Sequence, residues 1–267
     1  MKTAQKHIER TNKMFDPKDI HVVLIGNDRT IDQRINLELL RNHFSFGYDL
    51  WITTVYNGNP DDLPSGVGEN NFIFIPENRG YGYGALDAFN EGLDFAECIQ
   101  RPIVALFNFD VWFFREDGFV KWVTEFLESG CEFGAGLLPD HNLPMTDCMI
   151  FKKEYLKRLL PIEDKVHTIR KSYPVYQKMY EGTELGFENM EEWMMTSIYK
   201  TIPGQDILDI WWKFQRDGAP RYRYTEKYSL GHIHDYKDKV EKLQRYVSNF
   251  ENMPITKNLI DHIKGVK

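Results

Sequence analysis

Short apolar runs alternate with segments of helical periodicity along the first half of the chain. The clearest case lies in residues 71–114, where NFIFI is followed by a turn-forming cluster at 77–84, a segment with apolar residues at helical spacing at 85–96, and PIVALFNF. Runs rich in β-branched and aromatic residues indicate strands, and apolar residues every three or four positions indicate a helix. This region is therefore predicted to form a strand, a turn, a helix and a second strand.

Two more strands are predicted before this unit. The runs HVVLIG (21–26) and YDLWITTVYN (48–57) have strand length, and the segment between them, 31–44, has apolar residues at helical spacing and is followed by Gly47. Glycine is common just after the last turn of a helix. Strands that alternate with helices form a mostly parallel sheet covered by helices, so we expect a fold of the α/β class.

The rest of the chain is predicted to complete one domain and to add a C-terminal extension. A helix is expected at 118–129, and Asp117 is its expected N-cap. We expect a polar lead-in, one domain of about 200 residues with a mostly helical insertion inside it, and a charged amphipathic helical extension. The corresponding residues are 1–19, 20–235, 159–203 and 236–267.

Composition limits the class of protein and its partners. The chain has 267 residues, of which 42% are hydrophobic, and a formal net charge of −7. It is long enough to bury an α/β core, and its acidic balance argues against nucleic acid as the main partner. Three cysteines without metal-ligand spacing indicate reduced thiols in the cytoplasm. No apolar run approaches the ~20 residues of a membrane span, so we expect no transmembrane segment, while peripheral contact with the inner face of a membrane stays open.

Polar residues follow each predicted strand. The run at 102–109 breaks at Asn108 and Asp110, the first strand is followed by Asn27, and the second ends in Asn57. Ligands of open α/β sheets bind at the carboxyl ends of the strands, where a carboxylate can bind a cation. An isolated Asp at a strand end is more often a turn or cap residue than a metal ligand, so the surrounding motif decides between the two.

That motif resembles the GT-A glycosyltransferases. The segment LFNFDV at 106–111 and the residues before it are similar to the NxG…A…N.G…A…LNPDV pattern of family-2 enzymes, especially their rhamnosyltransferase-like branch. The residues that match before this segment are Asn78, Arg79, Gly80, Ala85, Asn90, Gly92 and Ala96. The resemblance implies a GT-A fold in which Asp110 binds the divalent ion that holds the diphosphate of a sugar nucleotide. Asn108 takes the first acidic position of the DxD motif, as in its NxD variant.

A second block of resemblance follows Gly204. The segment GQDILDIWWKFQRDG is similar to the family pattern GEDVDLxxRxxxxG, which is followed by a strand and a histidine. The resemblance implies that Asp206, on a helix, is the general base and that His232 reaches the metal or the diphosphate. Gln205 and Lys213 depart from the Glu and Arg of the pattern. Taken alone, the pair HxH that includes His232 is more often a surface or capping pair.

The expected donor contacts come from three strand ends and one loop. VYNGN at 55–59 resembles a family segment whose Asp touches the nucleotide base, and Tyr56 stands in place of that Asp. A tyrosine can stack on a base, although an ordinary turn explains Asn57 and Gly58 equally well. The predicted donor-binding residues are Asn27, Tyr56, Asn57, Asn78, Arg79, Gly80 and Asn108.

The predicted function is inverting sugar transfer. A carboxylate takes the proton of the acceptor hydroxyl as it attacks, which is the role expected of Asp206, with Glu192 as the alternative. A divalent ion, Mn²⁺ or Mg²⁺, stabilises the departing diphosphate. The resemblance suggests a UDP- or dTDP-sugar as donor and a glycan or glycolipid, as in polysaccharide biosynthesis, as acceptor.

Two other functions remain as alternatives. One is a non-catalytic GT-A-like module that binds sugar or protein, because of the departures at Tyr56, Gln205 and Lys213. The other is a dinucleotide enzyme, prompted by the glycines at 80–84. Their GxGxG spacing after the third strand is weak support, because the dinucleotide fingerprint is GxGxxG after the first strand.

Overall fold

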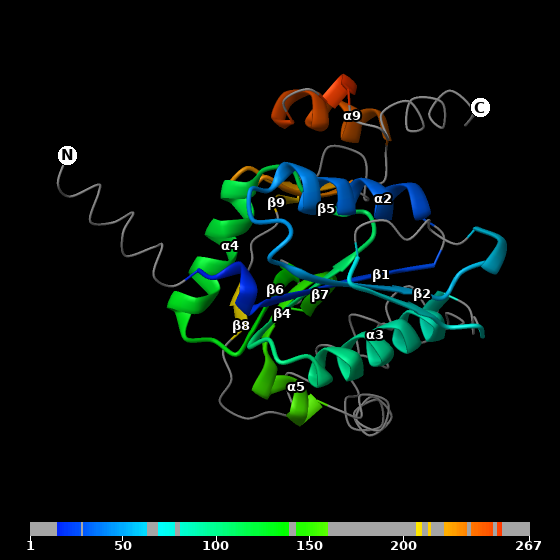
Figure 1. Ribbon diagram of the computed structural model, residues 1–267. Helices are drawn as coiled ribbons and strands as arrows, with labels where there is room; N and C mark the ends of the chain where they lie inside the picture. The colour runs from blue at the N-terminus through cyan, green and yellow to red at the C-terminus, as the bar shows by residue number, and fades with distance from the viewer. Residues whose placement is uncertain are drawn as a thin grey trace, which may run out of the picture.

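The computed structural model contains a seven-stranded main sheet with strand order β3-β2-β1-β4-β7-β6-β8 (Figure 1). The structure describes residues 15–27, 29–62, 69–77, 81–138, 143–159, 207–209, 213–214, 222–233, 236–247 and 250–252. In sheet order the strands are Asn71–Phe74, Trp51–Tyr56, Ile20–Gly26, Ile103–Asn108, Leu143–Lys152, Phe133–Leu138 and Ile207–Asp209. All neighbours pair in parallel except at β7, which is antiparallel to β4 and β6. The predicted α/β class with a mostly parallel sheet is confirmed.

The order of the strands reverses between β1 and β4. From β1 the chain proceeds outward through β2 to the edge strand β3, and helix α3 (Tyr81–Cys98) then returns it so that β4 pairs with the other side of β1. The loops that follow two such neighbouring parallel strands run in opposite directions. A crevice therefore forms at the carboxyl ends of the two strands, and α/β proteins bind ligands there. This topological switch point therefore lies between the loops that follow Gly26 and Asn108.

Helices cover both faces of the main sheet (Figure 1). One face carries α2 (Thr30–Glu38), its π-helical continuation Leu39–His43, and α4 (Glu116–Ser129). The other face carries α3 and α5 (Lys153–Leu159). Side chains of β1 alternate between the faces as expected for a strand: Val22 packs in the cluster of α2 and α4, and Val23 in that of α3 and α5.

A second, antiparallel sheet starts directly after the switch point. Its order is β5-β11-β10-β9, with the bounds Val111–Phe113, Leu230–Ile233, Tyr222–Thr225 and Lys213–Phe214. Leu243 of helix α9 (Tyr236–Tyr246) lies in one buried apolar cluster with Trp112 of β5 and Ile35 of α2. Helix α2 is thus enclosed between the main sheet on one side and the second sheet with α9 on the other.

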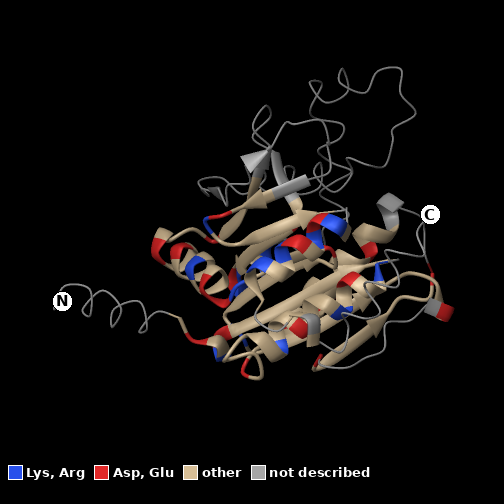
Figure 2. Cartoon of the chain, turned by 90° about the horizontal axis from the view of Figure 1, so that it is seen from above, with Lys and Arg blue, Asp and Glu red and all other residues tan. Residues whose placement is uncertain are grey.

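Charged residues lie mostly on the helices and loops, and the strands of the main sheet are largely without them (Figure 2). Strands β1, β2 and β4 contain no Lys, Arg, Asp or Glu, and their side chains are almost all buried. Burial of an ionised group is costly unless it is paired. The charged side chains that are buried near the ends of β1 and β4 are therefore the unusual feature of the interior.

Several sequence predictions are corrected in detail. Helix α3 begins at Tyr81, inside the expected turn cluster. Helix α4 begins at Glu116 after Arg115 as its N-cap, because the carboxylate of Asp117 forms an ion pair with Arg115 instead of capping the helix. The segment after Asp206 was expected to be helical, but residues 207–209 and 213–214 are strands that pair with β6 and β10.

The expected extension starts with a helix, α9, at Tyr236. None of the described helices has the length and apolar character needed to cross a membrane. The division into lead-in, domain, insertion and extension stays a prediction, since most of the expected insertion lies outside the described residues.

Candidate functional site

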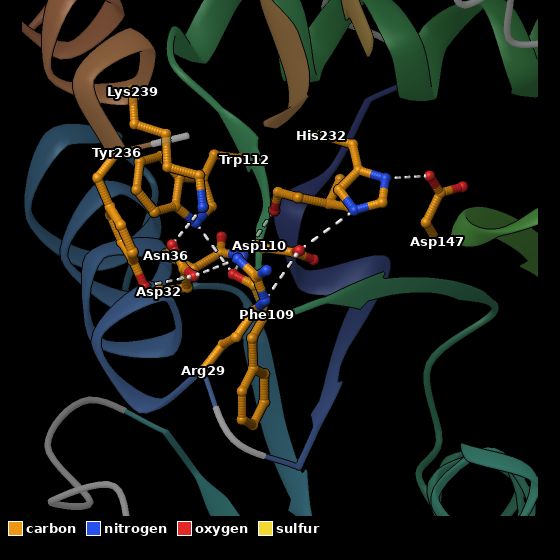
Figure 3. Close-up of polar contacts among 11 residues, drawn as sticks. Arg29, Asp32, Asn36, Phe109, Asp110, Trp112, Asp147, His232, Tyr236 and Lys239 are labelled. Carbon is orange, nitrogen blue, oxygen red and sulfur yellow. Dashed lines mark hydrogen bonds and ion pairs between the residues drawn. The ribbon is translucent and has the colours of Figure 1, made fainter. Parts of the chain in front are cut away.

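Asp110 lies at the switch point, between the end of β4 and the start of β5 (Figure 3). It is 5% exposed. Hydrogen bonds hold the backbone on both sides of it: Nδ2 of Asn36 donates to the carbonyl oxygens of Phe109 (3.4 Å) and Val111 (2.7 Å), and Nε1 of Trp112 donates to that of Phe109 (3.0 Å). The carboxylate is therefore held in place from α2 and from β5.

The second sheet brings His232 to Asp110. His232 on β11 pairs with Val111 on β5, next to Asp110 in the chain. Nε2 of His232 lies 3.2 Å from Oδ2 of Asp110, and Nδ1 lies 2.6 Å from Oδ2 of Asp147 on the antiparallel strand β7. Figure 3 shows the imidazole between the two carboxylates.

The two carboxylates favour the charged form of the histidine. Burial alone would lower the pKa of His232, but the charges of Asp110 and Asp147 and their hydrogen bonds outweigh it and raise this pKa to about 9. At neutral pH both ring nitrogens are therefore protonated and donate. Burial alone would raise the pKa of Asp110, but His232, Lys239 and Arg29 outweigh it and hold the pKa well below its usual range.

Arg29 is a second cation beside Asp110. It is the residue before α2 in the loop that follows β1. Its Nε lies 3.4 Å from Oδ2 of Asp110, and its Nη1 donates to Oδ2 of Asp32 over 3.3 Å. The guanidinium thus joins the carboxylate at the end of β4 to one in the first turn of α2.

A buried ion pair holds Asp32 from the opposite side. Nζ of Lys239, on α9, donates to Oδ1 of Asp32, and both residues are fully buried. The hydroxyl of Tyr236 donates to Oδ2 of the same carboxylate (3.1 Å), and the ammonium of Lys239 lies 4.3 Å from the ring centroid of Trp112. Burial raises the pKa of Asp32 and lowers that of Lys239, as expected for charges removed from water.

These contacts form one chain of alternating charge (Figure 3). It starts on α9, passes through α2 and the ends of β1 and β4, and ends on β11 and β7. Its members in order are Lys239, Asp32, Arg29, Asp110, His232 and Asp147. With His232 protonated, three cations balance three carboxylates, which is the condition under which buried charges are tolerated.

Asp110 and His232 can contribute to a divalent-metal site but do not complete one alone. Mg²⁺ is usually held by one or two carboxylates together with substrate phosphates and water. Within the described ranges, no group of three or more His, Cys, Asp or Glu is placed so that it could hold a metal ion. The residues present therefore fit an ion shared with a phosphate ligand, and not a metal bound by protein groups alone.

Two of the predicted donor residues are buried in this structure. The ring of Tyr56 is fully buried between Phe74 and Phe109, with centroid distances of 6.3 Å to each, so stacking on a base would require these rings to move. Nδ2 of Asn57 donates to the carbonyl oxygen of Gly84 and so joins the end of β2 to the first turn of α3. Both side chains shape the strand ends from within the core.

Asn27 and Asn108, by contrast, lie half-buried at the carboxyl ends of β1 and β4. The loop that contains Asn27 lies tightly against the end of β2: a Cβ at Gly58 would stand 1.5 Å from the carbonyl oxygen of Asn27. A Cβ at Gly26 would likewise stand 2.3 Å from the ring of Phe109. The two glycines therefore allow the strand ends of the site to approach one another.

The other predicted site residues lie outside the described part of the chain. They are Asn78, Arg79, Gly80, Glu192 and Asp206. The strand after Asp206 is described, and its register bears on the assignment of the base. Ile207 pairs with Phe133, which pairs with Phe151, which pairs with Val104 near the amino end of β4. The start of β8 therefore lies toward the edge of the sheet opposite to Asp110.

Four residues of the charge chain were not predicted: Arg29, Asp32, Asp147 and Lys239. Two carried a signal in the sequence. Lys239 occupies an apolar position of its helix, because Tyr236, Val240 and Leu243 lie on the same face at helical spacing, and a lysine there needs a buried partner. Asp147 likewise interrupts an apolar strand.

Comparison with known proteins gives distant likenesses. No protein-family model matches the chain, and no curated protein matches it. Among solved structures, it is similar to a mannosyltransferase of Pyrobaculum calidifontis in complex with GDP-Man and Mn²⁺, with 16% identity and a TM-score of 0.41, over 57% of this chain and 52% of that one.

A second similar structure is a candidate nucleotide-diphospho-sugar transferase from Desulfovibrio desulfuricans, with 10% identity and a TM-score of 0.44, over 92% and 96% of the two chains. The chain spans about half the length of the mannosyltransferase. These scores are too low to assign a family or an activity to the chain.

Proposed function

We propose that the protein is a glycosyltransferase of the GT-A type that takes a sugar from a nucleotide-diphosphate donor. One observation carries the proposal. Two sequence blocks resemble this family, and the structure brings the Asp of the first block within 3.2 Å of the His of the second. The contact lies at the switch point of a mostly parallel sheet, where such folds bind their ligands.

In this proposal the diphosphate of a UDP- or dTDP-sugar binds over the ends of β1 and β4. Asp110 and His232 would hold a divalent ion, Mn²⁺ or Mg²⁺, together with the phosphates, and Nε2 of His232 would lose its proton to do so. The ion neutralises the charge that develops on the departing diphosphate. Nδ1 of His232 donates a hydrogen bond to Asp147, which fixes the orientation of the ring.

The remaining donor contacts follow from position and from the resemblance. Asn27 and Asn108 are proposed to contact the donor directly, because they are half-buried at the two strand ends of the switch point. Tyr56 and Asn57 are proposed to support these strand ends from the core. Asn78, Arg79 and Gly80 are proposed as donor contacts from the resemblance alone.

The acceptor, a glycan or glycolipid, loses a proton as its hydroxyl attacks, and inversion needs a carboxylate for this step. Asp206 is the proposed base, with Glu192 as the alternative. The register of β8 does not support Asp206, because the strand that follows it begins toward the edge opposite to Asp110. Experiments on the base therefore include both residues.

The dinucleotide alternative is not favoured. Its glycine cluster follows the edge strand β3, and Gly82 and Gly84 lie in the first turn of α3, whereas a dinucleotide fingerprint follows the first strand at the switch point. A thermal-shift panel of UDP, dTDP, GDP and NAD, each with and without Mn²⁺, separates the two functions, since a ligand that binds the folded state raises its stability. Mn²⁺-dependent stabilisation by a nucleoside diphosphate supports the transferase, and stabilisation by NAD alone refutes it.

A further inference from the structure

The guanidinium of Arg29 is placed to bind an anion at the switch point. It follows β1 just as Asp110 follows β4, so the two side chains face each other across the point where ligands of such sheets bind. The side chain of Arg29 keeps 31% of its surface exposed, whereas those of Asp32 and Asp110 are 0% and 6% exposed. Arg29 is therefore the most exposed member of this contact.

The guanidinium also retains donors for such a ligand. Arginine has five N–H groups in a planar fork that matches phosphate oxygens. One at Nε faces Asp110 and one at Nη1 donates to Asp32. Within the described ranges no hydrogen bond or ion pair uses Nη2 of Arg29. A phosphate can therefore bind without displacing the contact to Asp32 that orients the guanidinium.

We propose that Arg29 binds the diphosphate of the donor, and that helix α9 positions it there through the buried pair of Lys239 and Asp32. This inference rests on the proposed function. Asp32 accepts from Arg29 on one side and from Lys239 and Tyr236 on the other, so the direction of its carboxylate depends on α9. Through Asp32, helix α9 thereby acts on the orientation of Arg29.

The chemistry explains why an arginine is suited to this role. Hydrogen bonds between charged partners are roughly twice as strong as neutral ones, and arginine stays protonated at every relevant pH. In the absence of a ligand, Arg29 offsets the buried charge of Asp110. When the diphosphate is bound, the same guanidinium neutralises charge on the leaving phosphate.

The test is a double-mutant cycle read out by calorimetric binding of UDP, dTDP or GDP, and of inorganic pyrophosphate, each with and without Mn²⁺. The variants are Arg29→Gln, Lys239→Met and the two combined. Arg29→Gln is expected to weaken binding by about 10- to 100-fold, the usual effect of losing a hydrogen bond between charged groups. Lys239→Met is expected to weaken it by about tenfold, as is typical for a group that orients a binding residue.

Coupling between the two residues distinguishes positioning from a purely structural role. In the Arg29→Gln background, Lys239→Met is expected to change the affinity by less than about twofold. The matched control is Lys242→Met, one turn further along α9, where Nζ lies 3.9 Å from the ring centroid of Tyr224 and has no contact with Asp32. If Lys239→Met does not fold, Tyr236→Phe, which removes the hydrogen bond to Asp32 and keeps the ring, replaces it in the cycle.

Each outcome decides between the claims. A nucleoside diphosphate that binds wild type and Arg29→Gln equally overturns the inference and leaves the proposed function standing. If Lys239→Met weakens binding by the same factor in wild type and in Arg29→Gln, α9 does not position Arg29. Arg29-dependent binding of pyrophosphate without binding of any nucleotide supports the inference and contradicts the proposed function. If wild type binds none of the probes, both are rejected.

Discussion

Nε2 of His232 lies 3.2 Å from Oδ2 of Asp110, although 122 residues separate them in the chain. The contact exists because Asp110 is where the chain leaves the main sheet for the second one, and β11 pairs with the strand that begins there. The second sheet therefore has a definite role in the molecule: it places an imidazole beside the carboxylate of the main sheet.

The buried pair of Asp32 and Lys239 should contribute strongly to stability. Removing one partner leaves the other charge buried and unpaired, which typically costs about 3 to 5 kcal/mol. Asp32→Ala is therefore expected to lower the free energy of unfolding by that amount in urea titrations. The control is Asp49→Ala, which removes a partner from an exposed pair with Lys18 and should cost less than about 1 kcal/mol. If both substitutions lower the free energy of unfolding by the same small amount, the buried pair contributes little to stability.

The acid stability of the protein should depend on His21. This side chain is fully buried, and its Nε2 lies 2.8 Å from Oγ1 of Thr53. Burial, with smaller effects from Arg101 and Lys153, lowers its pKa from 6.5 to about 3. The unfolded chain therefore takes up a proton between these values that the folded chain does not.

Because the folded state binds this proton less tightly than the unfolded chain, the protein becomes less stable as the pH falls. The stability that neutral His21 provides is complete above pH 6.5 and is lost as the pH falls toward 3, by up to about 1.4 kcal/mol per pH unit. Urea titrations across this range should show a shallower loss of stability in His21→Asn than in wild type. Parallel pH profiles for the two proteins would contradict the buried, neutral state of His21.

Gly58 should tolerate no side chain. A Cβ there would meet the backbone oxygen of Asn27 at 1.5 Å, and backbone cannot move aside as a flexible side chain can. Gly58→Ala is expected to destabilise the protein by at least about 2 kcal/mol and to weaken nucleotide binding, because it separates the ends of β1 and β2. Gly130→Ala is the comparison: no atom lies within 4 Å, and its φ of 74° alone should cost about 1 kcal/mol. Unfolding and calorimetry on both variants check this.

The general base can be assigned by measuring donor binding and sugar transfer separately in variants of Asp206 and Glu192. If Asp206 is the base, Asp206→Asn should keep donor binding and lose sugar transfer by about 100-fold or more, the usual contribution of general base catalysis. Glu192→Gln is the matched variant and should remain active. Retained transfer in Asp206→Asn together with lost transfer in Glu192→Gln would move the base to Glu192, in agreement with the register of β8.

The sequence predicted the main sheet well and the charge chain poorly, for physical reasons. Strands β1, β2 and β4 contain no charged residue and are mostly apolar, because both faces of the sheet are covered. The helical expectation after Asp206 failed because residues 207–209 form a strand at the sheet edge, where pairing with β6 decides the structure.

Long-range pairing explains what was missed at the site. Asp110 and His232 were found because each lies in a motif, but Asp32 and Lys239 are 207 residues apart and belong to no motif. Only the apolar neighbours of Lys239 on α9 indicated that it is buried. Its partner could not be identified until the packing of α9 against α2 and β5 was known.

The most direct test of the proposed function is calorimetric titration of wild type and Asp110→Ala with the nucleoside diphosphate that stabilises the protein most, with and without Mn²⁺. The control is Asp117→Ala, which changes an exposed carboxylate on α4. We predict Mn²⁺-dependent binding by wild type and by Asp117→Ala, and affinity at least about tenfold lower in Asp110→Ala, as expected on losing a metal-binding group. Equal Mn²⁺-dependent affinity in all three proteins would contradict the metal role of Asp110, and no binding by wild type would contradict the proposed donor site.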